Sequence, residues 1–190
     1  YRVGIIAQPD IDNAEDISRL GEPELFWGVT AGSLDSMIAN YTASGRKRRK
    51  DDLTPGGINN RRPDRATIVY TNLIRRYFKK TKPVVLGGIE ASLRRIAHYD
   101  FWDNKIRRSI LLDSKADYLL YGMAEKSVLQ LAERLAHKDP VEDLRGICYI
   151  SPSPPGRATI LPSFSEVSGN KKKFTEMFHL FYQNQDPFSP

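Results

Sequence analysis

The stretch VVLGGIEASLRR, residues 84–95, gives the clearest local indication of the fold of this chain. Three apolar residues are followed directly by Gly87 and Gly88, and then by a segment of helical character that carries Arg94 and Arg95. A short apolar run that ends in glycines before a helix is typical of a β-strand leading into a tight turn. The stretch therefore predicts one strand–turn–helix unit of an α/β fold.

The same unit recurs along the chain. Further strands are predicted at 1–7, 25–31 and 118–122, and helices at 64–80, 89–97, 106–112 and 125–137. Ser33 is the expected N-cap of one more helix, with an apolar face made of Leu34, Met37, Ile38 and Tyr41. Apolar strands that alternate with helices indicate an α/β fold with an open, mainly parallel sheet and helices on both faces.

The C-terminal part has a different character. Residues 146–151 and 159–164 read as the two strands of a β-hairpin around a Pro-rich turn, and a last helix follows around 174–181. We therefore expect an α/β domain at 1–140 and a hairpin with a helix at 141–190.

Composition narrows the class of protein. The chain has 190 residues, 40% of them hydrophobic, and no apolar run approaches the roughly 20 residues that cross a bilayer. It opens on a strand-like segment rather than on a secretory signal, so we expect a cytoplasmic location and no membrane partner. The single cysteine, Cys148, excludes an internal disulfide, and also a cysteine-based metal site or iron–sulfur cluster built from this chain alone.

Positive charge is concentrated in one segment. The chain has a net charge of +6, and residues 44–65 hold eight basic residues against three acidic ones. The run Arg46, Lys47, Arg48, Arg49 and Lys50 can bind phosphate backbones electrostatically, which makes RNA a candidate partner. No aromatic residue interleaves with the run to support stacking on bases. The alternative is a mobile, solvated loop over residues 44–63, and the sequence leaves both open.

The glycine turn is the first candidate site. In open α/β sheets, ligands bind beyond the carboxyl ends of the strands, where Gly87 and Gly88 would let a ligand approach the backbone. The stretch lacks the G-x-G-x-x-G spacing and the G-K-[ST] ending of phosphate-binding loops, and Glu90 would repel a phosphate. Spacing alone favours a structural corner.

The polar segment after the turn is the second candidate. Groups that can bind anions or stack on a base gather there: Arg94, Arg95, His98, Asp100, Trp102, Arg107 and Arg108. The alternative is that the arginines form a solvated helix face and that Phe101 and Trp102 belong to the core. His137 and Cys148 are expected to have structural roles, so the residues alone reveal no catalytic constellation.

Long segments of the chain resemble a known family. They are YRVGIIAQPD (1–10), FWGVTAGSLDSMIANYTAS (26–44), TPGGINNRRPDRATIVYTNLIRR (54–76), the segment from PVVLGGIEASLRR to YLLYGM (83–123) and LRGICYIS (144–151). These segments are similar to the N-terminal region of the YgiQ-type radical SAM proteins. The resemblance implies a cobalamin-binding, flavodoxin-like α/β domain, with one more strand and helix ahead of residue 1, followed by a radical SAM barrel.

The resemblance also bears on cofactors. In the family, a C-x-x-x-C-x-x-C motif of the barrel binds a [4Fe–4S] cluster, and the enzyme uses S-adenosylmethionine. The motif is absent from these residues, so we expect the chain to bind no cofactor and to be inactive alone. Cobalamin is not expected either. The D-x-H-x-x-G motif, which supplies the lower cobalt ligand in the cobalamin family, is missing. Many related radical SAM proteins resemble G-G-x-H at the glycine turn, and Glu90 occupies the position of that histidine in this chain.

Our hypothesis is an N-terminal accessory domain of a radical SAM enzyme of unknown substrate, which covers the barrel mouth and helps to bind substrate. The residues expected to face that mouth are Gly87, Gly88, Glu90, Arg94, Arg95, His98 and Trp102. Glu90 and His98 are candidates for proton transfer. The partner would be the C-terminal radical SAM domain of the same protein. The alternatives are an RNA-binding module that uses loop 44–63 and a cobalamin or nucleotide carrier domain.

Overall fold

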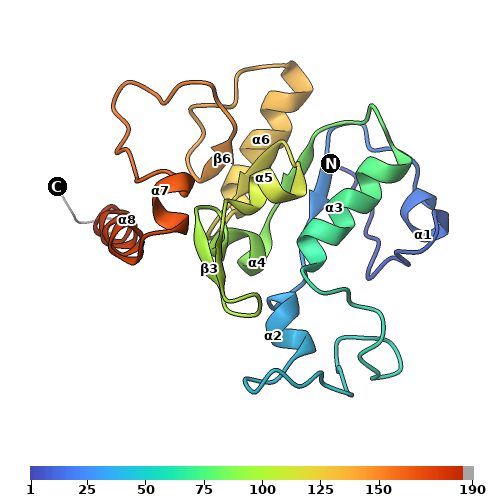
Figure 1. Cartoon of the computed structure of the whole chain (residues 1–190). Helices are drawn as coiled ribbons and strands as arrows, with labels where there is room; N and C mark the ends of the chain where they lie inside the picture. Colours follow the sequence, from blue (N-terminus) through green and yellow to red (C-terminus); the bar gives the residue numbers. More distant parts are fainter. Residues whose placement is uncertain (186–190) are drawn as a thin grey trace. The chain divides into compact units, whose positions relative to one another are not determined.

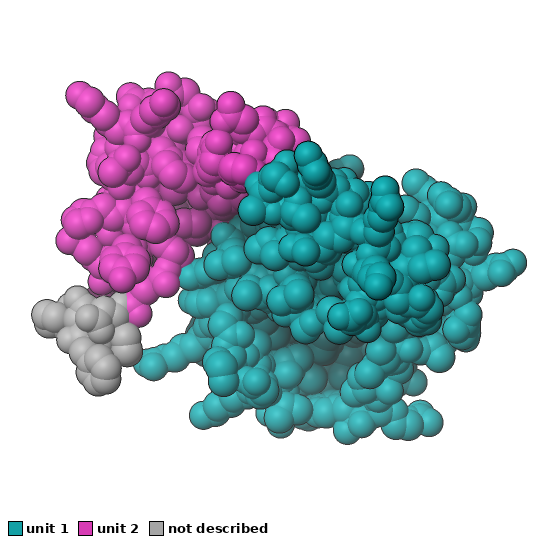
Figure 2. All heavy atoms as spheres, turned by 90° about the horizontal axis from the view of Figure 1, so that it is seen from below, with its two compact units in different colours: residues 1–95, 110–150 teal, residues 96–109, 151–190 magenta. Residues whose placement is uncertain are grey.

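The computed structural model describes residues 1–185 (Figure 1). The chain forms two compact units, one made of residues 1–95 and 110–150, the other of 96–109 and 151–190 (Figure 2). Residues 141–150, predicted to belong with the C-terminal part, lie in the first unit. None of the helices in the described residues combines the length and the apolar character that crossing a membrane requires.

The first unit is built on a four-stranded sheet with the order β1-β2-β5-β6. Its strands are β1 (Trp27–Val29), β2 (Val84–Leu86), β5 (Tyr118–Leu120) and β6 (Ile147–Tyr149). The first three run parallel, and β6 pairs antiparallel with β5. The predicted α/β class with a mainly parallel sheet is confirmed, although the sheet is mixed at one edge.

Helices cover both faces of this sheet. The helices of the first unit are α1 (Glu15–Ser18), α2 (Ser36–Asn40), α3 (Ala66–Tyr77), α4 (Gly88–Leu93), α5 (Ile110–Ser114) and α6 (Glu125–His137). Val84, Leu86 and Leu119 pack with residues of α1, α3 and α5 in one core. Val85 and Leu120 pack with α6 in a second core. Because side chains alternate across a strand, a continuous apolar run such as β2 serves both cores.

The strand predicted at 1–7 is wrong. These residues form no strand in the described structure, and Val3 and Ile5 are exposed. Alternating apolar residues favour an extended backbone, but a strand also needs a neighbour that completes its backbone hydrogen bonds.

Helix α2 starts later than predicted. Its N-cap is Asp35, whose side chain accepts hydrogen bonds from the backbone N–H groups of Met37 and Ile38, and not Ser33. Of the predicted apolar face, Met37 is buried, whereas Ile38 is 59% exposed. The apolar pattern therefore extends beyond the side that packs on the core.

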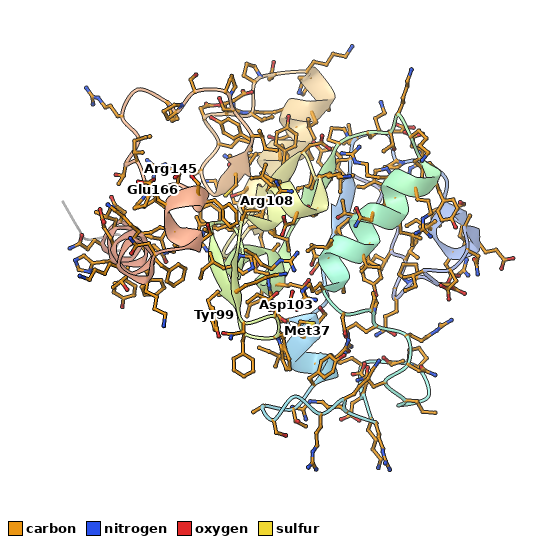
Figure 3. The ribbon with its side chains drawn as sticks, in the orientation of Figure 1. Met37, Tyr99, Asp103, Arg108, Arg145 and Glu166 are labelled. Carbon is orange, nitrogen blue, oxygen red and sulfur yellow. The ribbon has the colours of Figure 1, made fainter. Side chains whose placement is uncertain are left out.

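The second unit contains three elements that the sequence did not predict. Strands β3 (His98–Asp100) and β4 (Lys105–Arg107) form an antiparallel pair, and α7 (Phe164–Ser168) begins with a capping box between Ser163 and Glu166. Figure 3 labels Tyr99 of β3 and Glu166 of α7. The predicted helix at 106–112 is therefore wrong over its first residues, which belong to β4, while α5 continues its second half in the first unit.

The predicted C-terminal hairpin is also wrong. Residues 147–149 pair with β5, and no strand forms over 151–163. This segment contains Pro152, Pro154, Pro155 and Pro162, which cannot donate backbone hydrogen bonds to a ladder. The last predicted helix is confirmed as α8 (Lys171–Gln183).

Candidate functional site

The carboxyl ends of three strands define the candidate site. Strands β1, β2 and β5 run parallel, so their carboxyl ends lie at the same edge of the sheet. Each strand is followed within three residues by a glycine at positive φ, namely Gly32, Gly88 and Gly122. The chain therefore turns sharply at this edge, and no β-carbon stands at these three turns.

The two glycines of the central turn have different surroundings. Gly88 has φ +78°, and a β-carbon at this position would lie 2.4 Å from the Oγ1 atom of Thr30. Gly87 is extended, with φ −155°, and a β-carbon there would meet no atom within 4 Å. Gly88 thus forms the tight corner between two strand ends, and Gly87 lies on the open side of the turn.

Glu90 connects the turn to two helices. Its side chain is fully buried, and its residue is only 1% exposed. One carboxylate oxygen accepts a hydrogen bond from the backbone N–H of Ser36 at 2.8 Å, and the other accepts from the backbone N–H of Thr67 at 3.0 Å. These amides lie in the first turns of α2 and α3, where a negative charge also complements the helix dipoles.

The two arginines directly after α4, Arg94 at its C-cap and Arg95, are also engaged. Arg94 forms an ion pair with Asp35, the N-cap of α2, and donates to the carbonyl oxygen of Glu90 at 3.2 Å. The guanidinium carbon of Arg95 lies 4.6 Å from the ring centroid of Tyr121, within cation–π range. Each arginine therefore joins α4 to the segment that follows a neighbouring strand.

The structure brings five of the seven predicted residues to this edge: Gly87, Gly88, Glu90, Arg94 and Arg95. The other two, His98 and Trp102, lie in the second unit. There His98 belongs to β3, and the backbone N–H of Trp102 donates to the carboxylate of Asp100 at 3.0 Å. Proton transfer by Glu90 or His98 stays a prediction.

Sequence reasoning missed an apolar surface around the same edge. Five large apolar side chains are exposed there by 48% or more: Leu34, Ile38, Ile89, Leu93 and Met123. Spacing carries part of the signal, because Ile89 and Leu93 lie four residues apart within α4 and so share one side of that helix. Which of the apolar residues stay exposed depends on packing. We call this set the edge surface.

Backbone and side-chain hydrogen bonds hold the basic segment, residues 44–63, in a defined conformation. Isolated bridges pair Tyr41 with Lys47 and Lys50 with Ile58. The buried Asn59 side chain donates to the backbone oxygens of Asn40 and Arg48, at 3.3 and 3.0 Å. In Figure 1 the segment runs between the ends of α2 and α3 without forming a helix.

A buried ion pair lies inside the same segment. An Nη2 atom of Arg62 lies 2.7 Å from an oxygen of Asp51, and the two side chains are only 4% and 7% exposed. Burial by itself raises the pKa of Asp51, but hydrogen bonds from Thr54 and from the backbone of Leu53, together with the Arg62 charge, outweigh it and lower the pKa below its ordinary value.

This pair predicts a loss of stability at low pH. A carboxyl group with a lowered pKa stabilises the folded state above its unfolded pKa of about 3.9, and this contribution is lost as the pH falls through the lower folded value. We expect Asp51→Asn to lower the free energy of unfolding at pH 6, and the difference from wild type to shrink below about pH 4. Urea unfolding between pH 3 and 7 measures it. A difference that is constant with pH would contradict the prediction.

The residues of this chain do not fit an iron–sulfur cluster. Among residues 1–185, no three His, Cys, Asp or Glu side chains gather as metal ligands. Cys148 is the single cysteine, and burial raises the pKa of its thiol to about 11, whereas a cluster needs several thiolates. The glycine turn does not fit a cobalt ligand either, since both Glu90 oxygens accept hydrogen bonds from amides.

Comparison with known proteins gives the relationships of the chain. The Radical SAM N-terminal family model matches residues 1–190. Proteins named UPF0313 from Fusobacterium nucleatum and Thermotoga maritima are both 54% identical over 190 and 191 residues, covering 100% and 99% of this chain. A UPF0313 protein from Methanocaldococcus jannaschii is 52% identical over 186 residues.

The matches cover only part of these relatives. The chain spans 34% of the first two proteins and 30% of the third, about a third of their length. No solved structure matches the chain. The match of the family model along all 190 residues, together with these identities, shows that the chain belongs to the Radical SAM N-terminal family.

Proposed function

We propose that this chain is the accessory N-terminal domain of a radical SAM enzyme, and that its edge surface covers the mouth of the catalytic barrel and helps to hold the substrate. Family membership supports the first part. The observation that carries the second is the exposed apolar surface at the carboxyl edge of the sheet, where Ile89, Leu93 and Met123 are 48%, 60% and 89% exposed. The S-adenosylmethionine and the [4Fe–4S] cluster would be bound by the rest of the longer protein.

The chemistry of the edge favours contact with another protein surface. Three charged groups of the edge bind inward: Glu90 accepts hydrogen bonds from two amides, and Arg94 pairs with Asp35. The groups exposed at the edge include the five large apolar side chains and the glycine turns. Full burial of one large apolar side chain is worth roughly 1.5–3 kcal/mol, so covering several of them would provide a stable contact.

The sheet also supports the architecture that the resemblance implies. A mainly parallel sheet with helices on both faces is shared with flavodoxin-like and cobalamin-binding domains. Strand β1 lies at the edge of the described sheet, so a further strand can pair with it there. In this proposal the fold serves to place the carboxyl edge against the barrel, and the cofactor position of the turn is taken over by Glu90.

Hydrogen exchange tests the covering role. We expect the amides of residues 87–93 and 121–125 to exchange about tenfold more slowly in a full-length UPF0313 relative than in this chain alone, because covering the edge suppresses local opening. The amides of α3 serve as a control that should exchange alike in both proteins. Equal exchange of the edge amides in the two proteins would reject the covering role.

A further inference from the structure

We propose that the outer face of residues 44–63 is a preformed binding surface for the phosphate backbone of a nucleic acid. This inference goes beyond the covering role and does not depend on it, because it concerns a segment outside the edge surface. Three observations support it: the exposed charges of the segment are mostly positive, its neighbouring carboxylates are mostly bound inside the fold, and hydrogen bonds hold its backbone in place.

The exposed charges of the segment are almost all positive. All five residues of the run 46–50 are exposed, and so is Arg61. Arg48 donates from its Nε atom to the backbone oxygen of Tyr41 at 3.1 Å. No ion pair of Arg46, Lys47, Arg49 or Lys50 occurs within residues 1–185. Four cations close together without a carboxylate partner repel one another and attract polyanions.

The carboxylates that could neutralise this run are used elsewhere. Asp51 is buried against Arg62. Asp64 accepts hydrogen bonds from the side chains of Asn40 and Tyr41, at 2.8 and 2.6 Å. Asp52 is the exposed acidic residue that remains in the segment. The tertiary structure thus separates the charges, with the carboxylates bound inward and the cations presented outward.

The segment is held at both ends. Glu90 binds the first turn of α2, which precedes it, and the first turn of α3, which follows it. Asn59 fixes its middle by donating to Asn40 and Arg48. Because its backbone is already ordered, binding a ligand would cost less conformational entropy than it would for a disordered basic tail.

The side-chain chemistry favours a nucleic acid over a membrane. The guanidinium groups of the run match phosphate oxygens in a bidentate geometry. Peripheral membrane binding commonly uses an amphipathic helix with a broad apolar face. Residues 44–63 contain no helix, and their exposed large apolar side chains are only Leu53 and Ile58. Direct reading of bases is not expected, because the segment has no aromatic residue.

A salt titration tests the proposal. The probe is a fluorescein-labelled 20-nucleotide single-stranded RNA of mixed sequence, whose binding to this chain is followed by anisotropy at several salt concentrations. The test variant is Arg46→Gln, Lys47→Gln, Arg49→Gln, Lys50→Gln. The matched control replaces four exposed lysines outside the segment by glutamine, Lys79, Lys80, Lys126 and Lys171, and loses the same net charge.

We expect measurable binding whose logarithmic salt slope becomes shallower by about 3 in the test variant, since each phosphate contact on a single strand contributes roughly 0.7. The control should keep a slope close to that of the unmodified chain. Equal losses in both variants would mean that only bulk charge acts, and would overturn the proposal. Binding to vesicles of anionic phospholipid without binding to the RNA would also overturn it. Circular dichroism checks that both variants remain folded.

Discussion

Replacing Glu90 by alanine is expected to lower the free energy of unfolding by about 3–5 kcal/mol. The side chain is buried, and its oxygens accept hydrogen bonds from the backbone N–H groups of Ser36 and Thr67. Its removal leaves two buried donors without their acceptor, and each such donor costs about 1–3 kcal/mol, while the lost volume adds a cavity. Urea unfolding followed by the fluorescence of Trp27 and Trp102 measures the change.

Two further variants make this prediction specific. Glu90→Gln keeps the volume but places an NH₂ group against one of the two amide donors, so we expect a loss of about 2 kcal/mol. Glu125 also lies in the first turn of a helix, α6, but it is exposed, and Glu125→Ala should cost less than about 1 kcal/mol. If Glu90→Ala were no more destabilising than Glu125→Ala, Glu90 would not hold α2 and α3.

Replacing Gly88 by alanine is expected to lower the free energy of unfolding by about 3 kcal/mol. The positive φ of +78° alone costs an alanine roughly 1–2 kcal/mol. The new β-carbon would also lie 2.4 Å from the Oγ1 atom of Thr30, a short side chain that branches next to the backbone and cannot swing far. The same urea unfolding experiment measures the effect.

The neighbouring glycine supplies the control for this prediction. Gly87 is extended, and a β-carbon there has no neighbour within 4 Å, so Gly87→Ala should change stability by less than about 1 kcal/mol. The double variant Thr30→Ala, Gly88→Ala should recover part of the loss, because it removes the clash and leaves only the backbone cost. Equal effects of alanine at Gly87 and Gly88 would contradict the assignment of Gly88 as the tight corner.

These two residues show how far the candidate site could be predicted. The rule that ligands bind beyond the carboxyl ends of parallel strands located the turn from the stretch at 84–95 alone. The spacing of the glycines also favoured a structural corner, and Gly88 has that geometry. The hydrogen bonds of Glu90 could not be predicted, because its partners lie 54 and 23 residues away in the sequence.

The basic segment, residues 44–63, could likewise be predicted only in part. Composition identified the basic run but could not separate a mobile loop from an ordered one. The difference depends on buried polar side chains such as Asn59 and Asp51, which look like ordinary loop residues in the sequence. The Asn59 side chain, for example, donates to backbone oxygens 19 and 11 residues away, at Asn40 and Arg48.

The α/β class, the positions of β2 and α6, and the family could all be predicted from the linear chain, because apolar periodicity and long matching segments are properties of that chain. Three features could be found only in the folded protein: residues 1–7 form no strand, β6 pairs with β5, and the buried Glu90 carboxylate accepts hydrogen bonds from α2 and α3. The physical reason is that a local pattern specifies which side chains favour burial. The partner of a hydrogen bond or a strand is set by segments that are distant in sequence and meet only in the folded chain.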